Sequence, residues 1–246
     1  YALITHSDNM HFAKPDMAYY AEILARVGIE PDEAMMVGDS YRNDIEPAHH
    51  LGIHTFHVTP SGNGHTHGDG TLTDFYRKIT ETNWLNSLLP KPLIPDHIEP
   101  QLRGNMGALY GLLDQVKPDF WEQHPDPNEW SIIQIVCHLL ESEEQVQRPR
   151  LQQILHESNP FLANPKTPPG PQTAPCDTDG MRVADRLLEE RRTTINFLHT
   201  LSEDDWQRPA RHSIFGPTTL LEMAHFTAQH DRLHLNQLCQ TIGNCE

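Results

Sequence analysis

Histidines are the residues whose spacing first suggests chemistry in this chain. His230 and His234 lie four residues apart in a stretch with helical periodicity, so their rings point the same way from one predicted helix. Met223, Phe226 and Leu233 fall on the same side of that helix. The pair therefore lies on the face that we expect to be buried.

A third histidine, His138, lies far upstream on the apolar face of another predicted helix, near Ile135 and Leu139. Three imidazoles that meet in the core of a helical bundle would form a divalent-metal site with one open coordination position. Chance is the competing explanation. With 17 histidines in 246 residues, about one pair at this spacing is expected at random. Spacing alone leaves both explanations open.

Carboxylates form the second candidate group. Asp39 comes directly after the apolar run 34–37, and Asp44 follows five residues later. In a parallel α/β sheet, chemistry gathers at the carboxyl ends of the strands, and carboxylate oxygens are the ligands that Mg²⁺ prefers. The alternative is structural: a helix cap and a first-turn acid, both stabilised by the helix dipole.

The first part of the chain alternates between strand and helix patterns. Strands are predicted over 1–5, 34–37 and 53–58, and helices over 17–27 and 41–51, which end at Gly28 and Gly52. This order is typical of a parallel α/β sheet. A glycine-rich segment, 59–70, contains His65 and His67 and is predicted to be a flexible surface loop, and a helix is predicted over 72–89.

Prolines at 90, 92 and 95 mark a predicted domain boundary near residue 94, which divides the chain into 1–94 and 95–246. Four long helices are predicted after it, over 97–116, 131–156, 181–201 and 218–243, with a kink at Pro149. Their lengths and two longer connections indicate a four-helix bundle. Trp130 and Trp206 are expected to be core anchors.

The overall composition excludes several classes of protein. The net charge is −16 and no basic run stands out, so nucleic-acid binding is disfavoured. No apolar run reaches 18 residues, which argues against a membrane span. Four cysteines without CxxC spacing suggest reduced thiols in a cytoplasmic protein. The chain starts at Tyr1 inside an apolar run, which we interpret as the start of a fragment.

The N-terminal motifs resemble the C-terminal half of a haloacid dehalogenase-like (HAD) hydrolase over about residues 1–90. The motifs are Lys14-Pro15-Asp16, Met36-Val37-Gly38-Asp39-Ser40 and Asn43-Asp44. The resemblance implies that Lys14 and Asp39 are catalytic and that Asp39 and Asp44 hold Mg²⁺. The family's nucleophilic aspartate belongs to a DxD element, and this sequence has none. We therefore expect no phosphatase activity from this chain as given.

The C-terminal motifs resemble the DinB/YfiT-like superfamily of metal-binding four-helix bundles over roughly residues 95–243. The motifs are Glu129-Trp130-Ser131, Cys137-His138-Leu139, Phe215-Gly216 and the segment from His230 to Gln237. The resemblance implies a divalent metal (Zn²⁺, Ni²⁺ or Fe²⁺) on His138, His230 and His234, and a homodimer through the bundle. Glu141, Asp231 and Gln237 are candidate hydrogen-bond partners of the ligands, although surface polar roles are expected.

The sequence therefore predicts an incomplete HAD-like α/β piece fused to a DinB-like bundle. The expected activity is metal-dependent hydrolysis or thiol transfer on a small-molecule substrate. Two alternatives remain open. One is a Mg²⁺-dependent phosphatase in an intact parent protein whose nucleophile lies upstream of Tyr1, with the bundle as an accessory domain. The other is a non-enzymatic module for metal binding or dimerisation.

Overall fold

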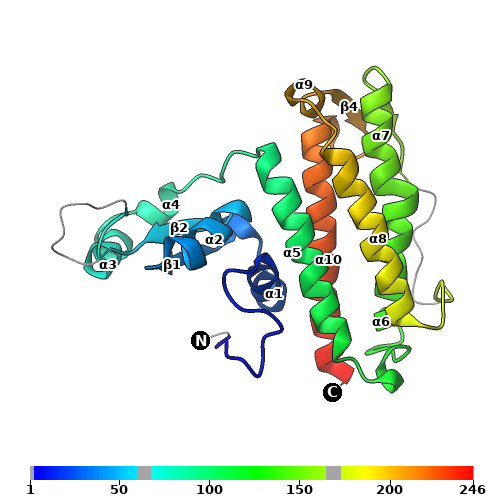
Figure 1. Cartoon of the computed structure of the whole chain (residues 1–246), viewed down its shortest axis with the longest axis horizontal. Helices are drawn as coiled ribbons and strands as arrows, with labels where there is room; N and C mark the ends of the chain where they lie inside the picture. The colour runs from blue at the N-terminus through cyan, green and yellow to red at the C-terminus, as the bar shows by residue number, and fades with distance from the viewer. Residues whose placement is uncertain (1–2, 60–67, 165–172, 246) are drawn as a thin grey trace.

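The chain forms an α/β lobe that lies beside a long helical bundle in a computed structural model (Figure 1). The structure describes residues 3–59, 68–164 and 173–245. The predicted fold class is confirmed: a small parallel sheet comes first and a bundle follows. The loop histidines His65 and His67 lie outside the described residues.

The lobe is built on two short parallel strands. β1 (Met35–Gly38) pairs with β2 (His54–His57), with Met35 opposite His54 and Gly38 opposite His57. The other elements of the lobe are α1 (Met17–Val27), η1 (Pro31–Glu33), η2 (Tyr41–Ile45), α2 (Glu46–His50), α3 (Leu72–Glu81) and α4 (Trp84–Ser87). α1 begins at Asp16, whose side chain accepts a hydrogen bond from the backbone N–H of Ala18, and ends at Gly28 with φ of 75°.

The strand predicted over 1–5 is wrong for the residues that the structure describes. Residues 3–5 have no strand partner, and the Ile4 side chain is 65% exposed. An apolar run becomes a buried strand only where a neighbouring strand supplies hydrogen bonds and another layer covers it. Instead, the hydroxyl of Thr5 lies 2.9 Å from that of Tyr19 on α1.

The bundle consists of α5 (Ile98–Asp114), α6 (Ile132–Ser142), α7 (Arg148–His156), α8 (Gly180–Leu198) and α10 (Leu220–Cys245). The π-helical segment η5 (Glu143–Gln147) joins α6 to α7, so the two form one continuous rod (Figure 1) with a π-helical turn just before Pro149. The short helices are η3 (Pro95–His97), η4 (Pro118–Phe120) and α9 (Glu203–Trp206).

A small sheet that the sequence did not predict closes one end of the bundle. β3 (Phe161–Leu162) runs parallel to β4 (Pro209–His212), and β4 pairs antiparallel with β5 (Gly216–Thr219). Gly216 has φ of 78°, a conformation that the tight β4–β5 turn requires and that glycine adopts without strain. β5 leads directly into α10, where Thr219 and Glu222 bond each other's backbone N–H groups.

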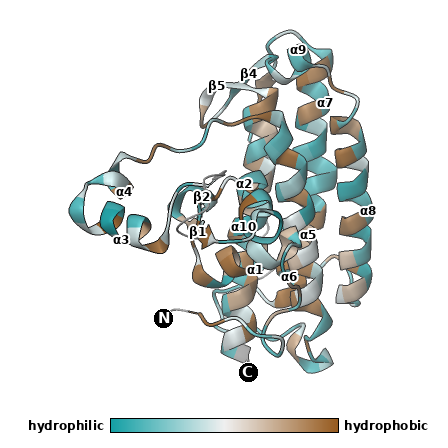
Figure 2. Cartoon of the chain, turned by 60° about the vertical axis from the view of Figure 1, so that its left-hand side comes forward, coloured by the Kyte–Doolittle hydropathy of each residue, from teal (hydrophilic) through white to brown (hydrophobic). Residues whose placement is uncertain are grey.

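The buried apolar side chains of the bundle helices form two clusters along its length. Figure 2 shows that hydrophobic and hydrophilic residues alternate along these helices. Buried polar side chains lie between the clusters at one level of each helix: Asn105 on α5, Glu143 on η5, Arg191 on α8 and Asp231 on α10. A layer of this kind is stable only when its members bond one another.

Although the lobe lies beside the bundle, the buried face of its helix α1 is part of the bundle core. Ala21 and Ala25 belong to the same apolar cluster as Leu109 of α5 and Leu235 of α10. The approach is close: a Cβ atom added at Gly107 would lie 2.7 Å from the Cβ of Ala18. The boundary near residue 94 stays a prediction, but the buried core extends across it.

The expectation of reduced thiols is wrong for two of the four cysteines. Cys137 on α6 and Cys176, 39 residues later, form a disulfide, whereas Cys239 is free. The pairing arises because the loop before α8 returns to α6, which residue spacing alone does not reveal. Among the described residues, no helix is long and apolar enough to cross a membrane.

Candidate metal centre

His138 on α6 and His230 and His234 on α10 converge in the bundle, as the resemblance to the DinB/YfiT-like superfamily implied. One ring nitrogen from each histidine lies within 4.8 Å of the other two. The Nε2 atoms of His138 and His230 are 3.2 Å apart. Nitrogen ligands of a tetrahedral Zn²⁺ ion lie about 3.3 Å apart when each metal–nitrogen bond is about 2.0 Å. The arrangement therefore fits a three-histidine centre.

The two helices begin in ways that fix the positions of these rings. The side chains of Ser131 and Gln134 form a capping box at the start of α6, about two turns before His138. His230 and His234 project from the middle of α10, where their i,i+4 spacing places both on one face. His234 is buried, whereas His138 and His230 are half-buried, so one side of the group remains accessible.

The environment favours neutral imidazoles. Burial, with a smaller contribution from the neighbouring imidazoles, lowers the pKa of His138 to about 4 and that of His230 to about 3. Burial also lowers the pKa of His234. A neutral imidazole has a free lone pair on one nitrogen, which is the form that binds a metal ion.

Gln237 holds one of the three rings in place. Its side-chain Oε1 lies 2.9 Å from Nδ1 of His234, so the Nδ1–H group donates to Gln237 and Nε2 keeps its lone pair. Gln237 is therefore a partner of a candidate ligand and not the surface polar residue expected from the sequence. Its position three residues after His234 was the informative feature.

Trp130 is next to the histidines, and its predicted role as a simple core anchor is wrong. The indole stacks on His234 with ring centroids 5.8 Å apart and an interplanar angle of 2°, and it lies 4.8 Å from the His138 ring. It immediately precedes the cap of α6, is half-buried, and belongs to neither apolar cluster of the core. Trp206, by contrast, is buried in the core as expected.

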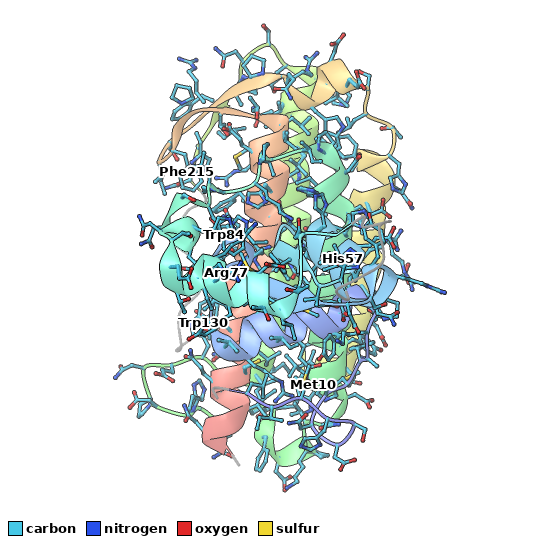
Figure 3. The ribbon with its side chains drawn as sticks, turned by 90° about the vertical axis from the view of Figure 1, so that its left-hand side faces the viewer. Met10, His57, Arg77, Trp84, Trp130 and Phe215 are labelled. Carbon is cyan, nitrogen blue, oxygen red and sulfur yellow. A yellow bond between two sulfur atoms is a disulfide. The ribbon has the colours of Figure 1, made fainter. Side chains whose placement is uncertain are left out.

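Aromatic rings also lie near His230, the histidine that Trp130 does not contact. The ring of Phe226 lies 6.4 Å from that of His230, and Phe215 lies 5.0 Å from Phe226. Phe215 is 50% exposed at the β4–β5 turn. Trp130 and Phe215 are seen on the same side of the molecule in Figure 3, with Phe215 nearer the β4–β5 sheet. Two aromatic walls therefore border the histidines.

A small cavity of about 20 Å³ lies against His138. Glu141, Trp130 and the Cys137–Cys176 disulfide are among its lining residues, and no lysine or arginine is among those described. The volume is enough for about one water molecule. Glu141 is half-buried, so its carboxylate belongs to the edge of the site rather than to the open surface.

Asp231 is also not a surface residue: its side chain is 1% exposed. Its Oδ1 accepts a hydrogen bond of 2.8 Å from Arg191, whose other guanidinium nitrogen donates to Glu143 at 2.6 Å. Burial raises the pKa of Asp231, and the Arg191 guanidinium opposes that rise. Asp231 directly follows His230 in the sequence. The positions of the charged residues along the chain did not indicate that Arg191 would pair with Glu143 and Asp231.

In the lobe, the structure brings together two of the three candidate residues. Lys14 Nζ lies 2.7 Å from Oδ1 of the buried Asp44, whose Oδ2 accepts from the backbone N–H of Ser40. Asp39 follows β1 as predicted and is exposed. Within the described ranges, the three histidines are the one group of three or more potential metal ligands. The catalytic and Mg²⁺ roles of Lys14, Asp39 and Asp44 stay predictions.

Comparisons with known proteins agree with this architecture. A model of the DinB superfamily matches residues 101–238, and a model described as HAD-hydrolase-like matches residues 11–74. Among solved structures, the chain is similar to YfiT from Bacillus subtilis, described as a probable metal-dependent hydrolase with an unusual four-helix bundle topology. The similarity covers 63% of this chain and 94% of YfiT, with a TM-score of 0.51 and 18% identity. No curated protein sequence gave a match.

Because the family match covers more than half of its length, the chain belongs to the DinB superfamily. The HAD-like match is confined to the lobe, which is the part that carries Lys14, Asp39 and Asp44. Both resemblances that the sequence motifs predicted are therefore confirmed. At 18% identity, the likeness to YfiT confirms the bundle fold.

Proposed function

We propose that the bundle is a metal-dependent hydrolase domain that acts on small, uncharged molecules. The observation that carries the proposal is the meeting of three neutral ring nitrogens, from two helices, within 4.8 Å at a half-open position. Purely structural zinc sites are closed by four protein ligands, whereas catalytic sites keep a position for water or substrate. The described YfiT activity supports the same assignment.

When bound, a divalent metal would supply a Lewis acid and lower the pKa of a coordinated water toward neutrality. His138, His230 and His234 would hold it, and Gln237 keeps His234 in the tautomer with a free Nε2. Glu141, at the edge of the cavity beside His138, is placed to accept a proton from water. Trp130 shields two of the rings from solvent.

The substrate class follows from the residues around the site. The aromatic walls of Trp130 and Phe226 favour flat or apolar groups, and the cavity lining described here holds no cation to pair with a phosphate or carboxylate. We therefore propose neutral esters, amides or lactones as substrates. Thiol transfer remains the alternative chemistry for the same centre, with a thiolate in the position of water.

The test is turnover of a panel of neutral esters and amides by protein loaded with Zn²⁺, Ni²⁺ or Fe²⁺, with and without an added thiol. Hydrolysis that needs metal but no thiol, and that falls at least about a hundredfold in Glu141→Gln, supports the proposal. Turnover that requires the thiol would reassign the centre to transfer. Full activity in His230→Ala would contradict the proposal that the three histidines hold the catalytic metal.

A further inference from the structure

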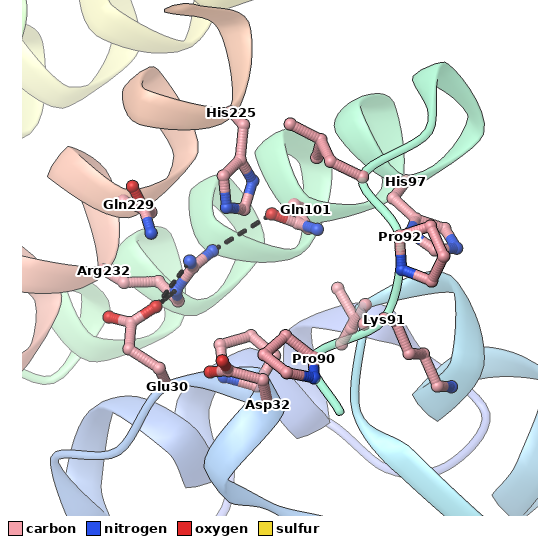
Figure 4. A pocket seen from close by; sticks show the side chains of 14 residues that line it. Glu30, Asp32, Pro90, Lys91, Pro92, His97, Gln101, His225, Gln229 and Arg232 are labelled. Atoms are coloured by element: carbon pink, nitrogen blue, oxygen red, sulfur yellow. Dashed lines mark hydrogen bonds and ion pairs between the residues drawn. The ribbon is translucent and has the colours of Figure 1, made fainter. Parts of the chain in front are cut away.

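The cavity of about 20 Å³ beside His138 lies between two parts of the chain. Residues 173–176 supply part of its lining, and the rest belongs to α6 or to Trp130 just before it. Residues on another side of α10 line a separate cavity, in which Arg232 is paired with Glu30 (Figure 4). Among its described lining residues, that second cavity has no cysteine and none of the three histidines. The position of segment 173–176 therefore bears on access to the candidate metal centre.

The segment 173–176 is attached to α6 at both of its ends. At its start, Nε2 of Gln134 donates a hydrogen bond of 2.7 Å to the backbone carbonyl of Thr173. At its end, Cys176 forms the disulfide with Cys137, the residue before His138. A hydrogen bond of this kind opens and closes readily, whereas a disulfide holds until a sulfur nucleophile attacks it. The disulfide is therefore the firmer of these two attachments.

The two halves of the disulfide differ in exposure. Cys176 is an exposed residue, whereas Cys137 is 4% exposed and belongs to an apolar cluster of the bundle core. Thiol–disulfide exchange requires a thiolate to reach one of the two sulfur atoms, and access decides which sulfur is attacked. An external thiol is therefore expected to attack Cys176 and to displace Cys137.

The sulfur that would be displaced already has a hydrogen-bond donor. The backbone N–H of Cys176 donates to Sγ of Cys137 over 3.0 Å. Neutral sulfur is a weak acceptor, but the same bond strengthens as negative charge collects on the sulfur during displacement. The described lining of the cavity includes Glu141 and no lysine or arginine, which disfavours thiols that carry a negative charge. The site therefore suits a small, uncharged thiol.

We propose that the Cys137–Cys176 disulfide is a reversible exchange site for such a thiol, and that exchange frees segment 173–176 from α6 and opens the cavity beside His138. The thiolate attacks Sγ of Cys176, and the bond to Cys137 breaks as a mixed disulfide forms on Cys176. Cys137 leaves as a thiolate and takes a proton from water. No external oxidant or reductant is needed, because one disulfide replaces another. Attack by Cys137 on the mixed disulfide reverses the step and releases the thiol.

The consequence for activity rests on the proposed function of the bundle, whereas the exchange itself does not. With the disulfide intact, the cavity has room for about one water molecule. Once segment 173–176 is no longer tied to α6, a larger molecule can reach the ring of His138 from this side. The small thiol would therefore raise the access of substrates to the candidate metal centre.

Mass spectrometry of the metal-free full chain tests the exchange. Free thiols are first blocked with N-ethylmaleimide. The chain is then incubated with mercaptoethanol, an uncharged thiol, and released thiols are trapped at early times with deuterated N-ethylmaleimide. One mercaptoethanol on Cys176 and one deuterated label on Cys137 are expected. The proposal is overturned by an adduct on Cys137 instead, by the absence of any adduct, or by blocking of both cysteines in the first step.

The reaction of His138 with diethyl pyrocarbonate tests the opening of the cavity, and it needs no metal ion. The double variant Cys137→Ser with Cys176→Ser keeps side chains of similar size but lacks the disulfide. Its His138 should react at least about fivefold faster than that of the oxidised wild type, because the segment can open locally. His212, buried at the end of the bundle that the β3–β5 sheet closes, should stay protected in both proteins.

Equal rates at His138 would overturn the proposal, and so would faster reaction of His138 and His212 together, which indicates general loosening of the bundle. If circular dichroism shows that the double variant fails to fold, the same rates are measured on the wild type after exchange with mercaptoethanol. The two proposals fail separately. Hydrolysis without exchange would overturn the present proposal alone, whereas exchange with faster reaction of His138 but no hydrolysis would remove only the proposed activity.

Discussion

Gln237 fixes the ring of one candidate metal ligand. Its Oε1 accepts the hydrogen bond of the His234 Nδ1–H group, which orients the ring and leaves the Nε2 lone pair free for a metal ion. We predict that Gln237→Leu lowers metal affinity by about 10- to 100-fold. Competition with a chromogenic chelator measures the change.

The matched control is Gln240→Leu on the same helix, an exposed residue that bonds Asn236. This substitution should leave metal affinity within about twofold of the wild type, since it adds the same side chain away from the histidines. Equal affinity for the wild type and Gln237→Leu would show that His234 needs no partner to act as a ligand.

Arg191 forms ion pairs with both Glu143 and Asp231 in the buried network. Replacing it by methionine leaves two buried carboxyl groups without a counter-charge, and we expect a loss of about 3 to 5 kcal/mol in the free energy of unfolding. Urea denaturation measures the loss. Arg192→Met, next to it but exposed and paired with Glu189, should change stability by less than about 0.5 kcal/mol.

At the scale of elements, the contact between α1 and α5 depends on a glycine. Gly107→Ala would place a Cβ atom 2.7 Å from that of Ala18, which forces the helices apart. Overpacking of this kind costs about 1 to 3 kcal/mol, against a gain in helix propensity of up to about 1 kcal/mol. We predict net destabilisation, detectable as a lower Tm by calorimetry.

Gly243→Ala on α10 serves as the comparison because nothing lies within 4 Å of its Cβ position. Here only the helix propensity changes, so the Tm should stay the same or rise slightly. A stability loss in Gly243→Ala as large as that in Gly107→Ala would mean that the close approach of α1 is not the cause.

At the scale of the whole molecule, the junction of lobe and bundle should respond to acid. Burial lowers the pKa of His97 to about 4, with smaller contributions from His49 and Lys91. Its ordinary value is near 6.5, so the unfolded chain takes up the proton first as the pH falls. The stability that His97 contributes is complete above about pH 6.5 and is lost between there and about pH 4.

His97→Leu should remove part of that dependence. We expect the difference in unfolding free energy between pH 7 and pH 4.5 to be smaller in the variant than in the wild type, when each is measured by urea denaturation at both values. An equal loss in the two proteins would show that other groups account for the acid sensitivity.

Much of this molecule could be predicted from local patterns. The helices were predicted from their periodicity, the stop at Gly28 and the Ser131–Gln134 cap. The i,i+4 spacing of His230 and His234 predicted that both lie on one helix face, which is the face that meets His138. Local patterns could not give the features that depend on distant contacts. These are the segment 3–5 without a strand partner, the β3–β5 sheet, the Cys137–Cys176 pair and the packing of Trp130 on His234.

Leu233 illustrates the same limit on α10. Its spacing assigned it to the buried face with His230 and His234, yet its side chain is 64% exposed. Periodicity does not fix the margin of a buried helix face, because the neighbouring elements decide which marginal residues are covered. Burial at the margins of a face is therefore set by the assembled bundle, not by the helix alone.

The most direct test of the central claim is metal content. The wild-type chain and the variants His138→Ala, His230→Ala, His234→Ala and His156→Ala are each equilibrated with Zn²⁺, dialysed and measured by elemental analysis. His156 is exposed at the end of α7 and serves as the control. We predict about one metal ion per chain in the wild type and in His156→Ala, and a large loss in each of the other three. Equal metal content in all five proteins would contradict a three-histidine metal centre.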